Sequence, residues 1–338
     1  MTEPGQQDNR YNFGKDMNPE ISVLIPTYNR APVLRQTLES MCALEFPEGF
    51  AEFIVVDNNS TDNTREVIEG FNGRLPVIYG FEQKQGQMAA RITAVGLAKG
   101  GLFIFTDDDI TPGKDWLKLY ADAAEKWPDY YVFGGPVVTI PPEGVDPVIV
   151  QAADVLGLGH LELDICEGVM PHGVYPLGAH FMLRRDAFEK FGLTIDPSIG
   201  PRGKSRISGS ETSIFRQLAD AGQKVVYLPD TTVMHRTDRE FWSMQTLKRR
   251  AFGQGRGRAH FAPVEPGCKR LFGIPRFLFS AAASLFLEEC RYLLTGNRVR
   301  RFQVRLSRMR CLGTILEYMN MAKANNAKSK KNNKCSGS

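Results

Sequence analysis

LFIFTDDDI, residues 102–110, is the stretch that decides the fold, because a short apolar run ends directly at three carboxylates. The run is too short for a helix and rich in aromatic and β-branched residues, so it predicts a buried strand. Open α/β sheets bind their ligands at the carboxyl ends of strands. Adjacent acids repel one another unless a cation neutralises them, and their oxygens suit Mg²⁺ or Mn²⁺. The alternative interpretation is a solvated acidic turn.

Two earlier strands also end at polar residues. Ile21–Ile25 leads into the loop Pro26–Arg30, and Phe53–Val56 ends at Asp57. A helical pattern follows each of them, and this alternation favours a parallel sheet with right-handed crossovers. The carboxyl ends of parallel strands lie along one edge of a sheet. We therefore expect the first loop, Asp57 and the three acids to share one crevice.

A third short strand, Val77–Tyr79, precedes a loop that contains Gly86 and a helix over residues 88–99. Gly86 permits a close approach of the backbone to a ligand. The following helix carries Arg91, and both a helix N-terminus and an arginine favour an anion. This segment therefore indicates an anion-binding position next to the acidic strand.

The second half of the chain offers one acid and one histidine at the ends of predicted elements. Glu211 lies in the first turn of a helix that begins near Ser210. Compensation of the helix dipole is by itself a sufficient explanation for an acid at this position. His235 lies in Val233–Arg236, a further edge strand or loop, and a single histidine is most often structural. Only a wider pattern gives these residues a chemical role.

Composition is that of an ordinary globular protein, with a marked asymmetry of charge. The 338 residues carry a net charge of +4, with 42% hydrophobic and 24% charged residues. Residues 248–338 contain 20 Lys and Arg against four Asp and Glu, whereas the part before them is acidic. The length suffices for one large domain or two small ones. An acidic body followed by a basic C-terminal region is the predicted organisation.

The six cysteines form no CxxC pair and no cluster with histidine, which argues against a structural zinc site. We expect reduced thiols in a cytosolic protein. Residues 1–18 are polar and lack an apolar core, so they do not resemble a signal peptide. We expect residues 1–19 to be disordered.

The basic C-terminal region contains three segments of different character. Residues 247–260, LKRRAFGQGRGRAH, combine basic side chains with glycines and predict either a flexible loop over the substrate or a solvated linker. Residues 277–287 are uncharged but too short to span a bilayer, which takes ~20 apolar residues. Residues 322–338 are rich in Lys, Asn and Ser, and we expect a disordered tail.

Arginines flank the uncharged segment 277–287 on both sides. An apolar segment between arginines is typical of an interfacial anchor that is attracted to anionic lipid. The competing interpretation is a helix packed on the rest of the protein with a basic outer face. We favour the membrane contact.

The motifs, in their order and spacing, resemble those of the family 2 glycosyltransferases with the GT-A fold, of the kind that acts in bacterial polysaccharide and glycan biosynthesis. The match covers residues 20–260. The matching segments are SVLIPTYNR (22–30), VVDNNSTDNT (55–64), QGQMAAR (85–91), FTDDD (105–109), LGAHFMLRRDAF (177–188) and GSETSIFRQL (209–218).

This resemblance implies a fold class and a division of the chain. The fold class is α/β, a Rossmann-like GT-A fold whose mixed, mainly parallel sheet is flanked by helices, with a C-terminal helical extension. The expected division is a GT-A domain over 20–260, a basic and helical extension over 261–321 that contacts membrane, and the two disordered ends, 1–19 and 322–338.

The resemblance also implies a reaction: metal-dependent, inverting transfer of a sugar from a nucleoside-diphosphate sugar, taken as a UDP-sugar, to a hydroxyl of a glycan or lipid-linked acceptor. Mg²⁺ or Mn²⁺ would stabilise the departing diphosphate. A carboxylate would accept the proton of the attacking hydroxyl. The family usually has two adjacent acids at this point. Here Ser210 replaces the first, and Glu211 stands where the base is expected.

Individual roles follow from the same motifs. Glu211 would be the catalytic base, Asp109 and His235 would serve the metal and diphosphate, and the sugar would lie by 178–180. Tyr28 would lie against the uracil, Asp57 would bind the base, and Asp107 would face the ribose. The full nucleotide set is Pro26, Thr27, Tyr28, Arg30, Asp57, Gly86, Arg91, Asp107 and Asp108. The sugar set is Gly178, Ala179 and His180.

Two rival functions remain open. A sugar-phosphate nucleotidyltransferase usually carries a glycine-rich loop after its first strand, whereas PTYNR at 26–30 has no glycine. A non-catalytic nucleotide-binding or nucleic-acid-binding protein would use the basic region. It would leave the acids 107–109 and Glu211 unexplained, and no alternation of aromatic and basic residues supports base stacking. We expect no nucleic-acid partner and a cytoplasmic enzyme at the inner face of the cell membrane.

Overall fold

The computed structural model describes residues 20–47, 51–158, 160–202, 205–261 and 267–335. Contacts within the chain divide it into two compact units. The first unit comprises Met1–Ile140, Gly159–Ser198 and Glu211–Arg236, and the second comprises Pro141–Leu158, Ile199–Ser210 and Thr237–Ser338. The expected tail 1–19 lies outside the described residues.

The first unit is built on a mixed sheet of eight strands in the order β3-β2-β1-β4-β9-β6-β12-β8. The four strands β3, β2, β1 and β4 are parallel to one another. β9 runs antiparallel to both of its neighbours, β4 and β6. β12 is parallel to β6, and β8 is antiparallel to β12. The strands are β1 (Ile21–Thr27), β2 (Ala51–Asp57), β3 (Val77–Phe81), β4 (Leu102–Thr106), β6 (Val132–Gly134), β8 (Gly168–Val169), β9 (His180–Arg184) and β12 (Val225–Tyr227). The sheet confirms the mixed, mainly parallel α/β prediction.

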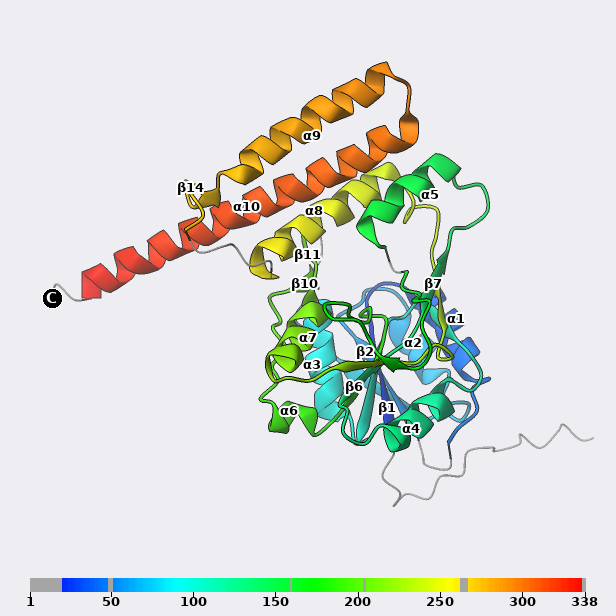
Figure 1. The fold of residues 1–338 in the computed structure, drawn as a ribbon. Helices are drawn as coiled ribbons and strands as arrows, with labels where there is room; N and C mark the ends of the chain where they lie inside the picture. Colours follow the sequence, from blue (N-terminus) through cyan, green and yellow to red (C-terminus); the bar gives the residue numbers. More distant parts are fainter. Residues whose placement is uncertain (1–19, 48–50, 159, 203–204, 262–266, 336–338) are drawn as a thin grey trace, which may run out of the picture. The chain divides into compact units, whose positions relative to one another are not determined.

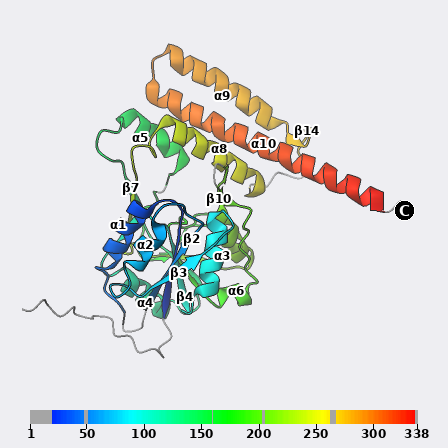
Figure 2. The same ribbon diagram turned by 180° about the vertical axis from the view of Figure 1, so that it is seen from behind.

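Helices cover both faces of this sheet, which explains why β1, β2 and β4 are buried along their whole length. Side chains of α1 (Ala31–Met41), α2 (Thr64–Glu69) and α4 (Trp116–Lys126) form one core with the strands. Those of α3 (Gln87–Leu97), α6 (Ala187–Lys190) and α7 (Ser210–Asp220) form the other. Figures 1 and 2 show the strands between these helices.

The strand order reverses between β1 and β4, and such a switch point is where open α/β sheets bind ligands. β1 ends at Thr27, β2 at Asp57, and β4 immediately before Asp107. A separate three-stranded sheet lies beyond this edge, in the order β5 (Ile110–Pro112), β13 (Val233–Arg236) and β7 (Val137–Ile140). In its register His235 is opposite Ile110, so the histidine lies beside the acids.

The second unit is mainly helical. Its long helices are α8 (Met244–Phe261), α9 (Phe277–Leu294) and α10 (Arg298–Cys335), with α10 between α9 and α8 in both views (Figures 1 and 2). The shorter elements are α5 (Pro147–Ala153), the 3₁₀ turn η1 (Asp154–Leu156), β10 (Gly200–Arg202), β11 (Ser205–Ile207), β14 (Arg270–Leu271) and β15 (Ile274–Pro275). The expected boundary at residue 260 falls at the end of α8, inside this unit.

The expectation of a flexible loop or linker over residues 247–260 is wrong, because these residues form most of α8. Their glycines permit close helix packing. A Cβ on Gly255 would lie 1.8 Å from the carbonyl oxygen of Arg310, and a Cβ on Gly313 of α10 would lie 2.1 Å from that of Phe252. The two backbones therefore approach each other through glycine from both sides. The hydroxyl of Thr314 donates to the carbonyl of Gly255 at 2.9 Å.

α10 continues to Cys335, well beyond residue 322, where we expected regular structure to end. Residues 336–338 lie outside the described part. Among the described residues, we find no helix with the length and apolar character needed to cross a bilayer.

Candidate functional site

Asp107, the first acid after β4, points toward two side chains of α3. Its Oδ1 accepts hydrogen bonds from Gln87 Nε2 at 2.9 Å and from Arg91 Nη2 at 3.0 Å. Its side chain is 28% exposed, whereas that of Arg91 is 1% exposed. Burial and the charges of Asp109 and Glu211 raise the pKa of Asp107, although Arg91 opposes them. Asp107 is therefore an oriented and partly accessible carboxylate.

Asp108, the middle acid, is buried and already has protein partners. Thr27 Oγ1 donates to its Oδ2 at 2.7 Å, and Arg30 Nη1 donates to its Oδ1 at 2.5 Å. Burial, with help from the neighbouring acids, raises the pKa of Asp108 to about 7 against the effect of Arg30. Asp108 was expected at the nucleotide. Its partners join the end of β1 to the acidic turn, and its place at the nucleotide stays a prediction.

Asp109, the third acid, lies between two cationic or titratable groups. Arg30 Nη2 donates to its Oδ2 at 2.8 Å, and His235 Nε2 lies 3.5 Å from the same oxygen. Burial alone would raise the pKa of Asp109, but the hydrogen bond and charge of His235 and the charge of Arg30 hold it well below its ordinary value. Oδ1 of Asp109 is buried and has no hydrogen-bond partner among the described residues.

Gly178 is the point at which Glu211 meets the pair of Arg91 and Asp107. A Cβ built on Gly178 would lie 3.3 Å from Oε2 of Glu211 and 3.4 Å from Nη1 of Arg91. Arg91 Nη2 also donates to the carbonyl oxygen of Gly178 at 2.7 Å. The structure thus brings together three segments that are far apart in sequence, and Glu211 is close enough to Asp107 to raise its pKa.

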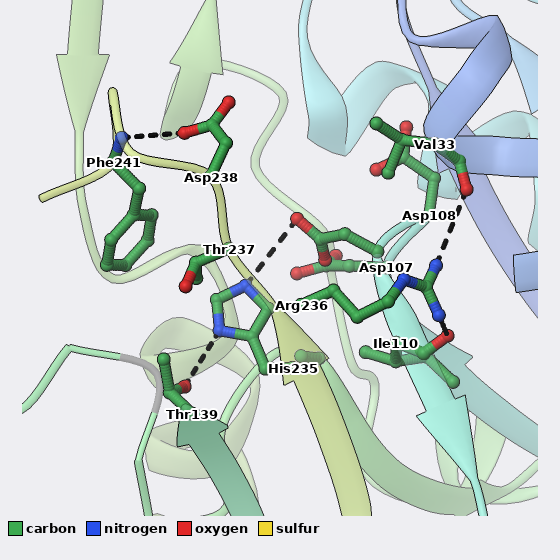
Figure 3. A network of polar contacts seen from close by, with 12 residues as sticks. Val33, Asp107, Asp108, Ile110, Thr139, His235, Arg236, Thr237, Asp238 and Phe241 are labelled. Carbon is green, nitrogen blue, oxygen red and sulfur yellow. Dashed lines mark hydrogen bonds and ion pairs between the residues drawn. The ribbon is translucent and has the colours of Figure 1, made fainter. Parts of the chain in front are cut away.

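His235 lies on β13 between Thr139 and the acidic turn (Figure 3). Its Nδ1 is 2.9 Å from the hydroxyl of Thr139. This contact orients the ring so that Nε2 faces the carboxylate of Asp109. A metal-binding histidine is commonly held in this way by a second polar group on its other nitrogen.

Arg236, next to His235, contacts the acidic turn through both its backbone and its side chain. Its backbone N–H donates to the carbonyl of Asp109 at 2.8 Å, and Nη1 donates to the carbonyl of Ile110 at 2.6 Å. Its guanidinium also reaches α1, where it contacts the carbonyl of Val33 (Figure 3). It contacts the hydroxyl of Thr37 as well. That hydroxyl donates to the carbonyl of Asp108 at 2.6 Å. The acids therefore sit on a rigid turn.

The residues that we expect to surround the nucleotide base lie at the ends of neighbouring strands. Tyr28 is 41% exposed, and Pro26 is buried within β1. Asp57 is 4% exposed and accepts from the backbone N–H of Ser60 at 2.9 Å. Gly86 adopts a φ of +145°, a conformation that favours glycine.

His180 does not lie where a sugar could reach it. Its side chain is fully buried and its Nε2 accepts from the indole N–H of Trp116 at 2.9 Å. Burial lowers its pKa to about 3, so the ring stays neutral. The prediction of a sugar contact for His180 is wrong, because the strand β9 turns this side chain into the core. Ala179 is nearly buried, and its carbonyl accepts from Thr106 at 2.8 Å.

The chemistry of the acids fits a divalent cation in part. Among the described residues no three His, Cys, Asp or Glu side chains are grouped closely enough to hold an ion by themselves. The buried oxygen Oδ1 of Asp109 nevertheless lacks a partner, and carboxylate oxygen with imidazole is a donor set that Mn²⁺ accepts. Mg²⁺ sites often consist of one or two carboxylates plus substrate phosphates. The residues therefore fit a site that the substrate completes.

Several site residues were absent from the sequence prediction. Gln87 binds Asp107, Thr37 and Arg236 hold the acidic turn, and Asn58 holds the Gly86 loop. Asn58 Nδ2 donates to the carbonyl of Lys84 at 2.8 Å, and its Oδ1 accepts from Gly86 N–H at 2.7 Å. Gln87 follows Gly86 directly, and that proximity was an available signal. Thr37 and Arg236 carried none.

The model of the family described as glycosyl transferase family 2 matches residues 22–192, which is half of the chain and contains the acids and Arg91. The chain belongs to this family and is a glycosyltransferase. Membership of this family favours a glycosyltransferase over the two rival functions, a nucleotidyltransferase and a non-catalytic binding protein.

Among curated proteins, the chain is similar to Glycosyltransferase AglE of Haloferax volcanii, with 26% identity over 220 residues that cover 64% of this chain and 67% of AglE. It is also similar to Succinoglycan biosynthesis protein ExoM of Rhizobium meliloti. The identity there is 28% over 244 residues, or 70% of this chain and 74% of ExoM.

Solved structures share the GT-A fold. The crystal structure of S. aureus TarS 1–349 in complex with UDP-GlcNAc has a TM-score of 0.52 at 16% identity and covers 86% of this chain and 89% of that chain. The mannosyltransferase PcManGT from Pyrobaculum calidifontis, in complex with GDP-Man and Mn²⁺, has a TM-score of 0.53 at 19% identity and covers 93% and 89%. At these identities the likeness concerns the fold alone.

Proposed function

We propose that this glycosyltransferase transfers a sugar with inversion from a UDP-sugar to an acceptor hydroxyl, with Glu211 as the base. The observation that carries the proposal is that Glu211 and Arg91, the partner of Asp107, both lie beside Gly178. A first-turn acid that served only to compensate the dipole of α7 would have no reason to lie beside Gly178 and Arg91. A carboxylate in this place is available to a hydroxyl that approaches the donor.

Glu211 accepts the proton of the acceptor hydroxyl while the oxygen forms a bond to the anomeric carbon of the donor. The bond between that carbon and the diphosphate oxygen breaks, and the nucleoside diphosphate leaves. A single in-line displacement of this kind inverts the configuration. Arg91 orients Asp107 through one hydrogen bond of 3.0 Å, and we assign the ribose side of the donor to Asp107.

Asp109 and His235 would hold Mg²⁺ or Mn²⁺ together with phosphate oxygens of the donor. When bound, the cation would supply charge stabilisation to the departing diphosphate. The unpartnered Oδ1 of Asp109 supports this assignment, as does the orientation of His235 by Thr139. Arg30 lies against Asp108 and Asp109 and neutralises their charges.

The base of the nucleotide would lie at the ends of β1 and β2. Tyr28 presents an exposed ring there, and Asp57 offers a carboxylate at the end of β2. The remaining residues of the proposed nucleotide set are Pro26, Thr27, Arg30, Gly86, Arg91 and Asp108, and those of the sugar set are Gly178 and Ala179. Thr27, Arg30 and Asp108 would act by holding the acidic turn, because they bind one another.

The acceptor would be a glycan or a lipid-linked glycan, and the enzyme would contact a membrane peripherally on the cytoplasmic side. Support for this part comes from the basic second unit and the exposed apolar residues of α9. Nucleic acid has no place in the proposal.

Donor hydrolysis tests the proposal without knowledge of the acceptor. The enzyme should slowly release UDP from UDP-glucose, UDP-galactose or UDP-N-acetylglucosamine in the presence of Mn²⁺, and much less in EDTA. GDP-mannose serves as the comparison donor. Release from GDP-mannose alone would overturn the choice of uridine, and equal release in EDTA would overturn the metal.

A further inference from the structure

α9 is attached to its neighbour α10 along one face only. The less exposed positions recur every three or four residues, at Leu278, Ala282, Leu285, Glu289 and Tyr292. Leu278 packs in a small core with Tyr318. The buried Glu289 accepts from Arg305 at 2.5 Å and from Arg308 at 2.9 Å. α9 is therefore held on α10 by the ion pairs of Glu289 and by the apolar packing of Leu278.

The outward face of α9 is apolar where a helix on the surface of a globular protein is normally polar. The exposed large side chains from residue 271 to the end of the helix are Leu271, Phe272, Phe277, Phe279, Phe286, Leu287, Leu293 and Leu294. Among them, Phe272 is 83% exposed and Leu294 is 88% exposed. The spacing of Phe279, Leu287 and Leu294 places them on one side of the helix. Exposed apolar residues gathered in this way mark an interaction site.

Charge on and around this face has a single sign. Arg276 precedes α9, Arg291 lies in its last turn, and both are exposed. Neither has an ion-pair partner among the described residues. The two acids of the helix do not oppose them on this face, because Glu289 is buried against α10 and Glu288 is only partly exposed beside it.

We infer that the outward face of α9 docks on a lipid surface that contains anionic headgroups, with the helix lying in the interface. Leu287, Leu294 and their neighbours would enter the acyl boundary, and Arg276 and Arg291 would pair with the headgroups. The inference deepens the peripheral membrane contact proposed above and rests on it. It adds the face of α9 that docks and the two arginines that meet the headgroups.

A second copy of the chain fits this face less well. Antiparallel pairing of two α9 helices would bring Arg276 of each against Arg291 of the other, and parallel pairing would align identical arginines. No acid on the outward face is available to neutralise them, so like charges would meet in either arrangement. Anionic headgroups supply the missing negative charge.

Co-sedimentation of the full chain with vesicles tests the inference. The protein should bind vesicles of phosphatidylcholine mixed with phosphatidylglycerol and should bind phosphatidylcholine alone much more weakly. Binding should fall in ~1 M salt, where the Debye length is ~3 Å. Replacing both Arg276 and Arg291 by Gln should weaken binding to the anionic vesicles roughly 25-fold, since each arginine near the surface is worth about fivefold.

The apolar part of the face has its own variant and a matched control. Leu287→Glu should weaken vesicle binding on the order of tenfold or more, because Leu287 is 67% exposed on the outward face. Ile92→Glu places the same charge at a 40% exposed position on α3 of the first unit and should leave vesicle binding unchanged. Circular dichroism and thermal unfolding of each variant verify that it is folded.

Three outcomes would overturn the inference: no sedimentation of the wild type with anionic vesicles, equal loss in Ile92→Glu, or a concentration-dependent dimer that Leu287→Glu dissolves. Donor hydrolysis in the same samples separates this inference from the proposed reaction. Hydrolysis without vesicle binding would remove the role of α9 alone. Vesicle binding without hydrolysis would remove the proposed reaction alone.

Discussion

Arg91 and Asp107 form an ion pair of 3.0 Å in which the arginine side chain is 1% exposed and the carboxylate is 28% exposed. The arginine is thus the buried support and the carboxylate is the accessible partner. Arg91 Nη2 also donates to the carbonyl of Gly178, so the same guanidinium positions the segment that meets Glu211. Loss of this one side chain should disturb both sides of the site.

Arg91→Met should lower the free energy of unfolding by about 2–3 kcal/mol, the usual cost of removing hydrogen bonds to a charged group. Affinity for UDP should fall as well, because Asp107 loses its orientation. Thermal unfolding and calorimetry measure the two effects. Arg65→Met is the control: Arg65 pairs with Glu69 on the surface of α2, and its loss should leave both properties near wild type. Equal effects of the two substitutions would contradict the supporting role of Arg91.

Glu211→Gln should reduce turnover ~10²–10⁴-fold, because an amide cannot accept the proton of the acceptor hydroxyl. Affinity for UDP should stay near wild type. Steady-state rates and calorimetry measure these two quantities. Glu66 is an exposed acid in the first turn of α2, so Glu66→Gln is a matched control that should retain full activity. Near-normal turnover in Glu211→Gln would remove this residue from the mechanism.

Gly178→Ala should reduce turnover at least ~10-fold while the protein remains folded. The new Cβ would lie 3.2 Å from the carboxyl carbon of Glu211, so Glu211 or Arg91 must shift, and small displacements at a catalytic site are costly. Gly96→Ala on α3 meets no atom within 4 Å and is the control. Wild-type rates in Gly178→Ala would show that Glu211 has room to move without consequence.

Asp109→Asn should weaken the Mn²⁺-dependent affinity for UDP at least ~10-fold, as loss of groups around a metal generally does. Affinity measured in EDTA should change much less. Calorimetry with UDP in both conditions gives the comparison. Asp220→Asn, at an exposed position on α7, should match the wild type. If the wild type bound UDP with the same affinity with and without Mn²⁺, that result would argue against the metal assignment.

His180 should make stability depend on pH. Its pKa is lowered by burial from 6.5 to about 3, so below pH 6.5 the unfolded chain binds a proton that the folded chain excludes. The contribution of His180 to stability is therefore complete above pH 6.5 and decreases by about 1.4 kcal/mol per pH unit as the pH falls toward 3.

Denaturant unfolding at a series of pH values measures this slope. His180→Gln should show a flatter profile between pH 6.5 and 5, at a lower overall stability because Trp116 loses its acceptor. His172→Gln, at an exposed position, should keep the wild-type slope. An unchanged slope in His180→Gln would show that His180 does not cause the dependence.

Local pattern was sufficient for several elements of the first unit. Apolar runs such as LFIFT are read correctly as strands because burial on both faces demands continuous apolar residues, and the structure has β4 at Leu102–Thr106. The helix over residues 247–260 was missed, because its glycines lower helix propensity, whereas contact with α10 selects glycine. The residues of α10 that select these glycines lie some sixty residues further along the chain.

The sequence by itself determined which strands end in polar groups, and therefore the edge at which Asp107, Asp57 and Thr27 lie, because side-chain alternation and burial are properties of each segment. Only the tertiary structure decided which side chains meet there. The antiparallel register of β9 against β4 turns His180 into the core and sets Gly178 beside Arg91. The approach of Glu211 to that point depends on packing between segments that no local pattern connects.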